Sequence, residues 1–131
     1  WWISLISTGW VQTRTETAAT IVIRGNQLAE VEGKKIYADK RVRQAIVMAV
    51  DNDVLLELGY AGRGITAKNQ HVGPMHPEYA DVPRLPFDPA KAKALMEEAG
   101  MADFEHELHS IDDAWRKDTT DAVAAQLRDA G

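Results

Sequence analysis

Apolar residues recur at helical spacing in the segment that begins near residue 39. Five of them share one helical face, at positions i, i+3, i+4, i+7 and i+8: Val42, Ala45, Ile46, Ala49 and Val50. Asp39 stands where an N-cap is needed, because its carboxylate can accept a hydrogen bond from a free N–H of the first turn. The pattern predicts a helix over 39–50, and its two alanines predict the close approach of a neighbouring element.

A second, shorter helix is predicted directly after the first. Asp51 is placed to cap it, and Gly59 and Gly62 indicate its end. The residues expected to face inward are Val54, Leu55 and Leu58.

Two longer helices are predicted in the second half of the chain. Asp88 and Pro89 supply an N-cap and a proline at the first helical position, and Gly100 follows the end, which predicts a helix over 88–99. The last helix is predicted over 114–129. The residues expected to face inward are Ala92, Leu95, Met96 and Ala99 on the first helix, and Trp115, Ala122, Val123 and Leu127 on the second.

Two segments have the pattern of β-strands. Residues 20–25 contain a β-branched run that is followed by Asn26. Residues 104–110 alternate, with Phe104, His106 and Leu108 on one side. A strand between two helices is typical of an α/β unit, here in a parallel sheet whose other strands lie outside this chain. The predicted fold class is therefore α/β.

The rest of the chain is a lead-in segment and a long loop. Residues 1–19 carry no clear pattern and form an unassigned lead-in, whereas residues 20–131 form the structured part. Prolines 74, 77, 83 and 86 exclude a long helix from residues 62–87, and a loop of this length is usually functional or lies across a neighbour. Because the chain starts at Trp1 and ends at a helix-capping glycine, we expect it to be an excerpt from a longer protein.

Composition excludes several classes of protein. The 131 residues are 45% hydrophobic and carry a net charge of −5, which argues against a disordered chain and against a nucleic-acid partner. The sequence contains no run of the roughly 20 apolar residues that a membrane span needs. The absence of cysteine excludes disulfides, thiolate metal sites and cysteine nucleophiles.

Histidines are the obvious candidates for a metal site, and their spacing is unfavourable. His106 and His109 are three residues apart on a predicted strand, so they point to opposite faces. His71 and His76 lie in one loop without a defined third ligand. We expect no metal.

Catalytic patterns are equally weak. The glycine-rich residues 59–64 follow a helix rather than a strand, so they lack the context of a dinucleotide site. The serines do not lie in a nucleophile elbow. Arg41 and Arg43 lie on different sides of a helix, which favours structural ion pairs over a binding fork. We therefore expect neither an enzyme nor a cofactor.

Two motifs resemble one protein family. Residues 39–51, DKRVRQAIVMAVD, resemble the arginine-valine-arginine-x-alanine helix of family 5 extracellular solute-binding proteins, the dipeptide, oligopeptide and nickel receptors of bacterial ATP-driven importers. Residues 87–100, FDPAKAKALMEEAG, resemble the family's aromatic-aspartate-proline-x-lysine-alanine helix. The motifs stand in the family's order and at its spacing, and the resemblance covers residues 20–131.

The resemblance implies a particular part of a larger fold. The resemblance implies a type II periplasmic-binding-protein-like fold, in which two lobes joined by crossing strands close on the ligand. The strand ending at Arg24, Gly25 and Asn26 resembles the hinge segment that enters the carboxy-terminal lobe. The chain would then be an internal fragment, running from the hinge into the first half of that lobe.

Candidate ligand-binding residues follow from the α/β expectation. Open α/β sheets bind ligands at the carboxyl ends of their strands, where Ser110, Ile111 and Asp112 would lie. The loop residues Asn69, Gln70 and His71 could approach the same crevice with amide and imidazole groups suited to a peptide backbone.

The resemblance leads to an expected function. We expect the substrate-binding component of an ABC importer, which captures a small solute, a di- or oligopeptide, and delivers it unchanged to a membrane permease. Such a receptor would be a monomer, either periplasmic or a cell-surface lipoprotein, with no nucleic-acid partner. The alternative is a small stand-alone α/β interaction module without a transport role.

Overall fold

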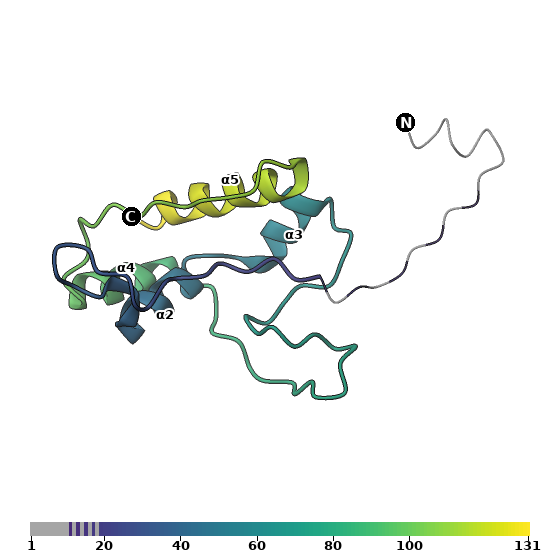
Figure 1. Cartoon of the computed structure of the whole chain (residues 1–131), viewed down its shortest axis with the longest axis horizontal. Coiled ribbons are helices and arrows are strands. Elements are labelled where there is room, and N and C mark those ends of the chain that lie inside the picture. Colours follow the sequence, from purple (N-terminus) through teal and green to yellow (C-terminus); the bar gives the residue numbers. More distant parts are fainter. Residues whose placement is uncertain (1–10, 12, 14, 16, 18) are drawn as a thin grey trace.

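The described part of the chain folds into helices joined by loops. The structure is a computed structural model that describes residues 11, 13, 15, 17 and 19–131, so most of the predicted lead-in lies outside the described residues. The helical elements in this part are η1 (Ile36–Ala38), α2 (Lys40–Met48), α3 (Asn52–Tyr60), α4 (Pro89–Glu98) and α5 (Ala114–Asp129). Figure 1 shows α2 and α4 at one end, α3 at the other, and α5 running between them.

Aspartates begin all four α-helices of the described residues. The side chains of Asp39, Asp51, Asp88 and Asp113 each accept a hydrogen bond from a backbone N–H two or three residues later, at 2.8–3.1 Å for the shortest bond of each. These bonds satisfy N–H groups that have no partner within the helix. The predictions of helices over 39–50, 88–99 and 114–129 are confirmed, with ends shifted by at most two residues.

Helices α2 and α4 pack antiparallel. The backbone N–H of Asp88, which caps α4, donates to the carbonyl of Met48 at the end of α2, at 2.8 Å. At the other end, the Arg41 guanidinium of α2 donates to the carbonyl of Glu98 at the end of α4, at 2.7 Å. Each helix therefore satisfies an unpaired end group of its neighbour.

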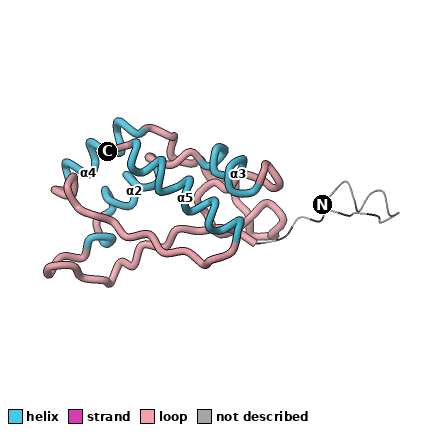
Figure 2. Tube along the Cα trace, turned by 90° about the horizontal axis from the view of Figure 1, so that it is seen from above, coloured by secondary structure: helices cyan, strands magenta, loops and turns pink. Residues whose placement is uncertain are grey.

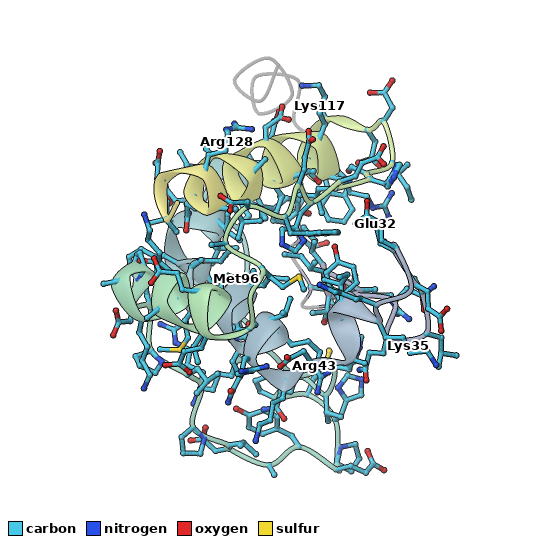
Figure 3. All side chains as sticks on the ribbon, turned by 90° about the vertical axis from the view of Figure 1, so that its left-hand side faces the viewer. Glu32, Lys35, Arg43, Met96, Lys117 and Arg128 are labelled. Atoms are coloured by element: carbon cyan, nitrogen blue, oxygen red, sulfur yellow. The ribbon has the colours of Figure 1, made fainter. Side chains whose placement is uncertain are left out.

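The core lies where these two helices meet the end of α5. Its buried members are Ala45, Met48, Ala49 and Ala92, with Leu95, Met96, Leu127 and Ala130 packed against them. Figure 3 shows Met96 pointing from α4 into this interior. The predicted inward faces of α2, α4 and α5 are confirmed.

Helices α3 and α5 form the second antiparallel pair. The N–H of Asp51, before α3, donates to Gln126 Oε1 near the end of α5, at 2.6 Å. Tyr60 at the end of α3 packs against Trp115 at the start of α5, with ring centroids 5.7 Å apart and the rings tilted by 58°.

The expected inward face of α3 is wrong at two of its three positions. Val54 and Leu58 are 41% and 62% exposed, whereas Gly59 is buried. The buried face is set by the contact between Gly59 and α5, where a glycine allows closer approach than a leucine does. Helix rotation about this contact turns Val54 and Leu58 to the surface.

The two predicted strands are also wrong, so the α/β class is not confirmed for this part of the chain. The described residues contain no β-strand, only an isolated bridge between Val31 and Lys34. Figure 2 shows residues 20–25 and 104–110 as loop. A strand needs ladder pairing with a neighbouring strand, and neither segment is part of a β-ladder in the described chain. Several of their apolar side chains stay exposed, among them Ile23 at 46%.

Substitution of Ala45 tests the α2–α4 contact. Ala45 is 1% exposed, so Ala45→Leu adds volume to a filled core and should lower the free energy of unfolding by about 1–3 kcal/mol. Denaturant unfolding measures this value. Ala94→Leu is the control, because Ala94 is exposed on α4. Equal stability of the two variants would contradict the packing.

Substitution of Gly59 tests the α3–α5 contact. A Cβ at Gly59 would lie 2.0 Å from Thr119 Oγ1 and 2.9 Å from Thr119 Cα. Gly59→Ala should therefore destabilise the protein by about 1–3 kcal/mol, although alanine favours helix by about 1 kcal/mol. Thermal unfolding compares it with Gly73→Ala, whose new Cβ would meet nothing closer than 3.7 Å. A more stable Gly59→Ala variant would show that the helices are farther apart.

Candidate functional site

The first group of predicted ligand-binding residues lies in the loop after α3. Asn52 at the start of α3 donates from Nδ2 to the carbonyl of Ala67, at 2.8 Å, and to Asn69 Oδ1, at 3.0 Å. Asn69 has a positive φ of 60°, a conformation that asparagine tolerates better than most residues. The first turn of α3 therefore fixes the backbone on which the group sits.

Gln70 and His71 differ in how they are held. Gln70 Nε2 donates to the carbonyl of Ala80 at 3.0 Å, so this amide joins the two arms of the loop. His71 is exposed, which leaves its imidazole accessible from solvent. Asn69 and Gln70 hydrogen-bond within the protein, and Asn69 and His71 are both exposed.

The second predicted group precedes α5. Ser110 Oγ donates to the carbonyl of Ile111 at 3.2 Å, and Ile111 is 64% exposed. Asp112 is exposed, while the neighbouring Asp113 is the N-cap of α5. Asp112 therefore keeps an accessible carboxylate beside a helix start.

The structure places the two groups near opposite ends of α3. The loop group is bound to Asn52 in the first turn of α3, whereas the second group lies by the start of α5, which Tyr60 at the end of α3 contacts. The nine residues of α3 make about 13 Å at the helical rise of about 1.5 Å per residue. The two groups thus form separate patches instead of one cluster.

The predicted hinge residues show one close contact. A side chain at Gly25 would meet the ring of Tyr37 at 3.1 Å, so the backbone passes directly over that ring. Asn26 Oδ1 accepts from the N–H of Leu28 at 3.0 Å and begins a turn, and Arg24 is exposed. The hinge assignment itself stays a prediction.

The predicted structural ion pair is confirmed for Arg41, whereas Arg43 bonds to backbone carbonyls instead. Arg41 forms an ion pair with Asp39 at 2.7 Å. Arg43, labelled in Figure 3, donates to the carbonyls of Tyr37 and Ala38 at 2.8 and 2.9 Å. Both guanidinium groups therefore hold helix ends.

The structure contains a half-buried cluster around His106 that was not predicted from the sequence. Tyr37 OH lies 3.0 Å from His106 Nδ1, and the ring of Phe104 meets His106 edge-on at 4.8 Å. His106 Nε2 is buried without a partner among the described residues. The alternation of Phe104 and His106 indicated burial, but the tyrosine is far away in sequence and carried no signal.

The described residues contain neither a metal-binding cluster nor a helix that could span a membrane. They contain no group of three or more histidine, aspartate or glutamate residues that could hold a metal ion. His106 lies inside, whereas His109 is exposed and lies 3.3 Å from Glu107. None of the helices in the described part of the chain is both long and apolar enough to cross a membrane.

An open groove lies elsewhere, at the end of α4. Its volume is about 340 Å³, and residues 31–36 and 100–104 contribute its lining. None of the predicted ligand-binding residues lines it.

A family comparison identifies the chain. The model of the bacterial extracellular solute-binding proteins, family 5, matches residues 7–131. The chain belongs to this family. The match begins before residue 20, where the motif resemblance starts.

Several family members with curated names are similar to part of the chain. The dipeptide-binding protein of Escherichia coli K12 is 43% identical over 68 residues, which make 52% of this chain and 13% of that protein. The heme-binding protein A of Haemophilus influenzae is 37% identical over 67 residues, or 51% of this chain and 12% of that protein. The di/tripeptide-binding protein 3 of Pseudomonas aeruginosa is 37% identical over 70 residues, or 53% and 13%.

The chain therefore matches only a small share of the length of these family members. No solved structure matches it at a significant level. All three relatives are named as binding proteins.

The pKa of His106 makes stability depend on pH. Burial lowers this pKa, so the unfolded chain binds the proton more readily than the folded protein does. The stabilisation is complete above the ordinary value of 6.5 and is lost as the pH falls through the window below it. Unfolding free energies at about pH 7.5 and about pH 5.5 measure the loss.

The matched variants separate His106 from other histidines. His106→Gln should show a smaller loss of stability over this pH interval than the unaltered protein. His109→Gln, at an exposed position, should show the same loss as the unaltered protein. A His106→Gln variant with an unchanged pH profile would contradict the burial of the imidazole.

Proposed function

We propose that the chain is part of the carboxy-terminal lobe of a longer solute-binding protein, which captures a small peptide and delivers it to the permease of an ABC importer. The observation that carries this proposal is the 43% identity to a protein named a dipeptide-binding protein. The family match over residues 7–131 supports it independently. Because the relatives are named for binding, we propose that the solute is released unchanged.

We propose that both polar patches face the ligand: Asn69, Gln70 and His71 in the loop, and Ser110, Ile111 and Asp112 before α5. A peptide spans at most about 3.3–3.6 Å per residue, so one of about four residues bridges the length of α3. A dipeptide would contact only one patch. The imidazole of His71 and the carboxylate of Asp112 would bind the peptide's carbonyl and amino groups.

The structural part of the proposal is a β-sheet that includes residues 20–25 and 104–110. Residues 20–25 and 104–110 leave apolar side chains exposed, among them Ile21 at 44% and Leu108 at 37%. We propose that strands from the rest of the protein pair with both segments, which gives the lobe an α/β fold. Arg24, Gly25 and Asn26 would then lead into the hinge.

The proposed setting is outside the cytoplasm. The family is named for extracellular proteins, and we propose a periplasmic or lipid-anchored monomer that meets its permease at the membrane. The net charge of −5 supports a partner other than nucleic acid.

Calorimetry with a mixed pool of di- to pentapeptides tests the function. The full-length protein should bind peptides far more tightly than the isolated 131-residue chain, for which we expect a Kd no better than about 1 mM. A small-ligand pocket covers about 70–90% of its ligand, and part of one wall cannot do so. Each side chain ordered on that wall also costs about 0.5–1.5 kcal/mol.

Three outcomes contradict parts of the proposal. A full-length protein that binds no peptide would remove the peptide assignment. Hemin is titrated in parallel because one relative is named a heme-binding protein. Binding of hemin instead of peptide would replace the peptide assignment by a hemin assignment. Micromolar binding by the isolated chain, abolished by His71→Ala or Asp112→Ala, would favour the stand-alone module.

A further inference from the structure

One carboxylate joins the two ends of the long loop between α3 and α4. Thr66 Oγ1 donates to Asp53 Oδ1 at 2.6 Å, and the Arg84 guanidinium donates to Asp53 Oδ2 at 2.9 Å. Each oxygen of Asp53 thus holds one end of residues 66–84, here called the clamped loop. Figure 1 shows this part of the chain projecting away from the helices.

Side chains also connect the two arms of the clamped loop. Lys68 forms an ion pair with Asp81, and Gln70 Nε2 donates to the carbonyl of Ala80. Thr66, Lys68 and Gln70 all belong to the first arm of the loop. All three reach across to the other arm or to the shared carboxylate.

The tip of the clamped loop is closed by its own contacts. The N–H of Gly73 donates to His76 Nδ1 at 3.0 Å, and the N–H of His76 donates to the carbonyl of Gly73 at 3.0 Å. The loop is therefore ordered internally, and its orientation depends on how its base is attached.

That base rests on a rigid element. Asp53 lies in the first turn of α3, next to Asn52, which holds Ala67 and Asn69. A small cavity of about 10 Å³ lies at this junction. Its lining includes Asn52, Asn69 and Arg84. The hydrogen bonds from Thr66 and Arg84 hold the pKa of Asp53 below its ordinary value, which keeps the carboxylate charged.

We propose that Asp53 is a positioning residue, which holds both ends of the clamped loop on α3 and so fixes the orientation in which His71 meets the peptide. This inference rests on the proposed function. Asp53 and Arg84 have side chains that are 61% and 37% exposed, and exposed ion pairs add little to global stability. Loss of the pair should therefore affect the loop and the ligand much more than the fold.

The experiment compares Asp53→Ala with the unaltered full-length protein. Amide hydrogen exchange within residues 66–84 should become about fivefold faster or more, while the melting temperature changes little. Binding of tetraalanine, measured by calorimetry, should weaken about tenfold. Asp53→Asn keeps an acceptor for Thr66 but lacks the charge for Arg84, and it should give intermediate values.

Two controls separate positioning from a general loss of structure. Asp121→Ala removes another exposed ion pair, to Lys117 on α5, and should leave exchange in the loop and tetraalanine binding unchanged. In a His71→Ala background, Asp53→Ala should cause a clearly smaller further loss of affinity than it does alone, because the two changes share the contact of His71 with the peptide. A purely structural effect would add to the loss from His71→Ala.

The outcomes distinguish the inference from the function on which it rests. Unchanged exchange in residues 66–84 of Asp53→Ala would overturn the clamp, whatever the ligand. Faster exchange with unchanged tetraalanine affinity, or additive losses with His71→Ala, would overturn the positioning role. An unaltered protein that binds neither peptide nor hemin would overturn the proposed function, and the exchange measurement would still decide whether Asp53 holds the loop.

Discussion

Close contact between small residues is the constraint on which this structure depends. Ala45 and Ala49 of α2 lie against Ala92 of α4, and Gly59 of α3 lies against Thr119 of α5. Protein interiors are filled to the density of crystals, so contacts of this kind fix the spacing and rotation of the helices. The exposed face of α3 and the position of both polar patches follow from that spacing.

Hydrogen bonds between the helix ends fix the positions from which the loops start. The carbonyl of Met48 and the side chain of Gln126 accept backbone N–H groups from the caps of neighbouring helices. The bond from Asp51 to Gln126 thereby holds the start of α3 on α5, and the clamped loop is attached to the first turn of α3. Binding residues on loops are often positioned by a rigid scaffold, and we propose that arrangement around Asp53 and His71.

Local chemistry explains what could be predicted from sequence. Asp51 and Asp88 were identifiable as caps because their partners lie two or three residues away. Strands were not predictable in the same way, because pairing depends on chain far away in sequence. The bond between Asp53 and Arg84 is another long-range contact, with no periodic signal. The same holds for the separation of the two patches, because the antiparallel packing of α3 on α5 decides it.

We propose that these helices form part of a two-lobed peptide receptor whose remaining strands complete a sheet. The most direct test is a crystal structure of the full-length protein with a bound peptide. We expect residues 104–110 to be hydrogen-bonded to strands outside residues 20–131, and His71 to contact the peptide. Unpaired residues 104–110, with the peptide away from both patches, would contradict this assignment.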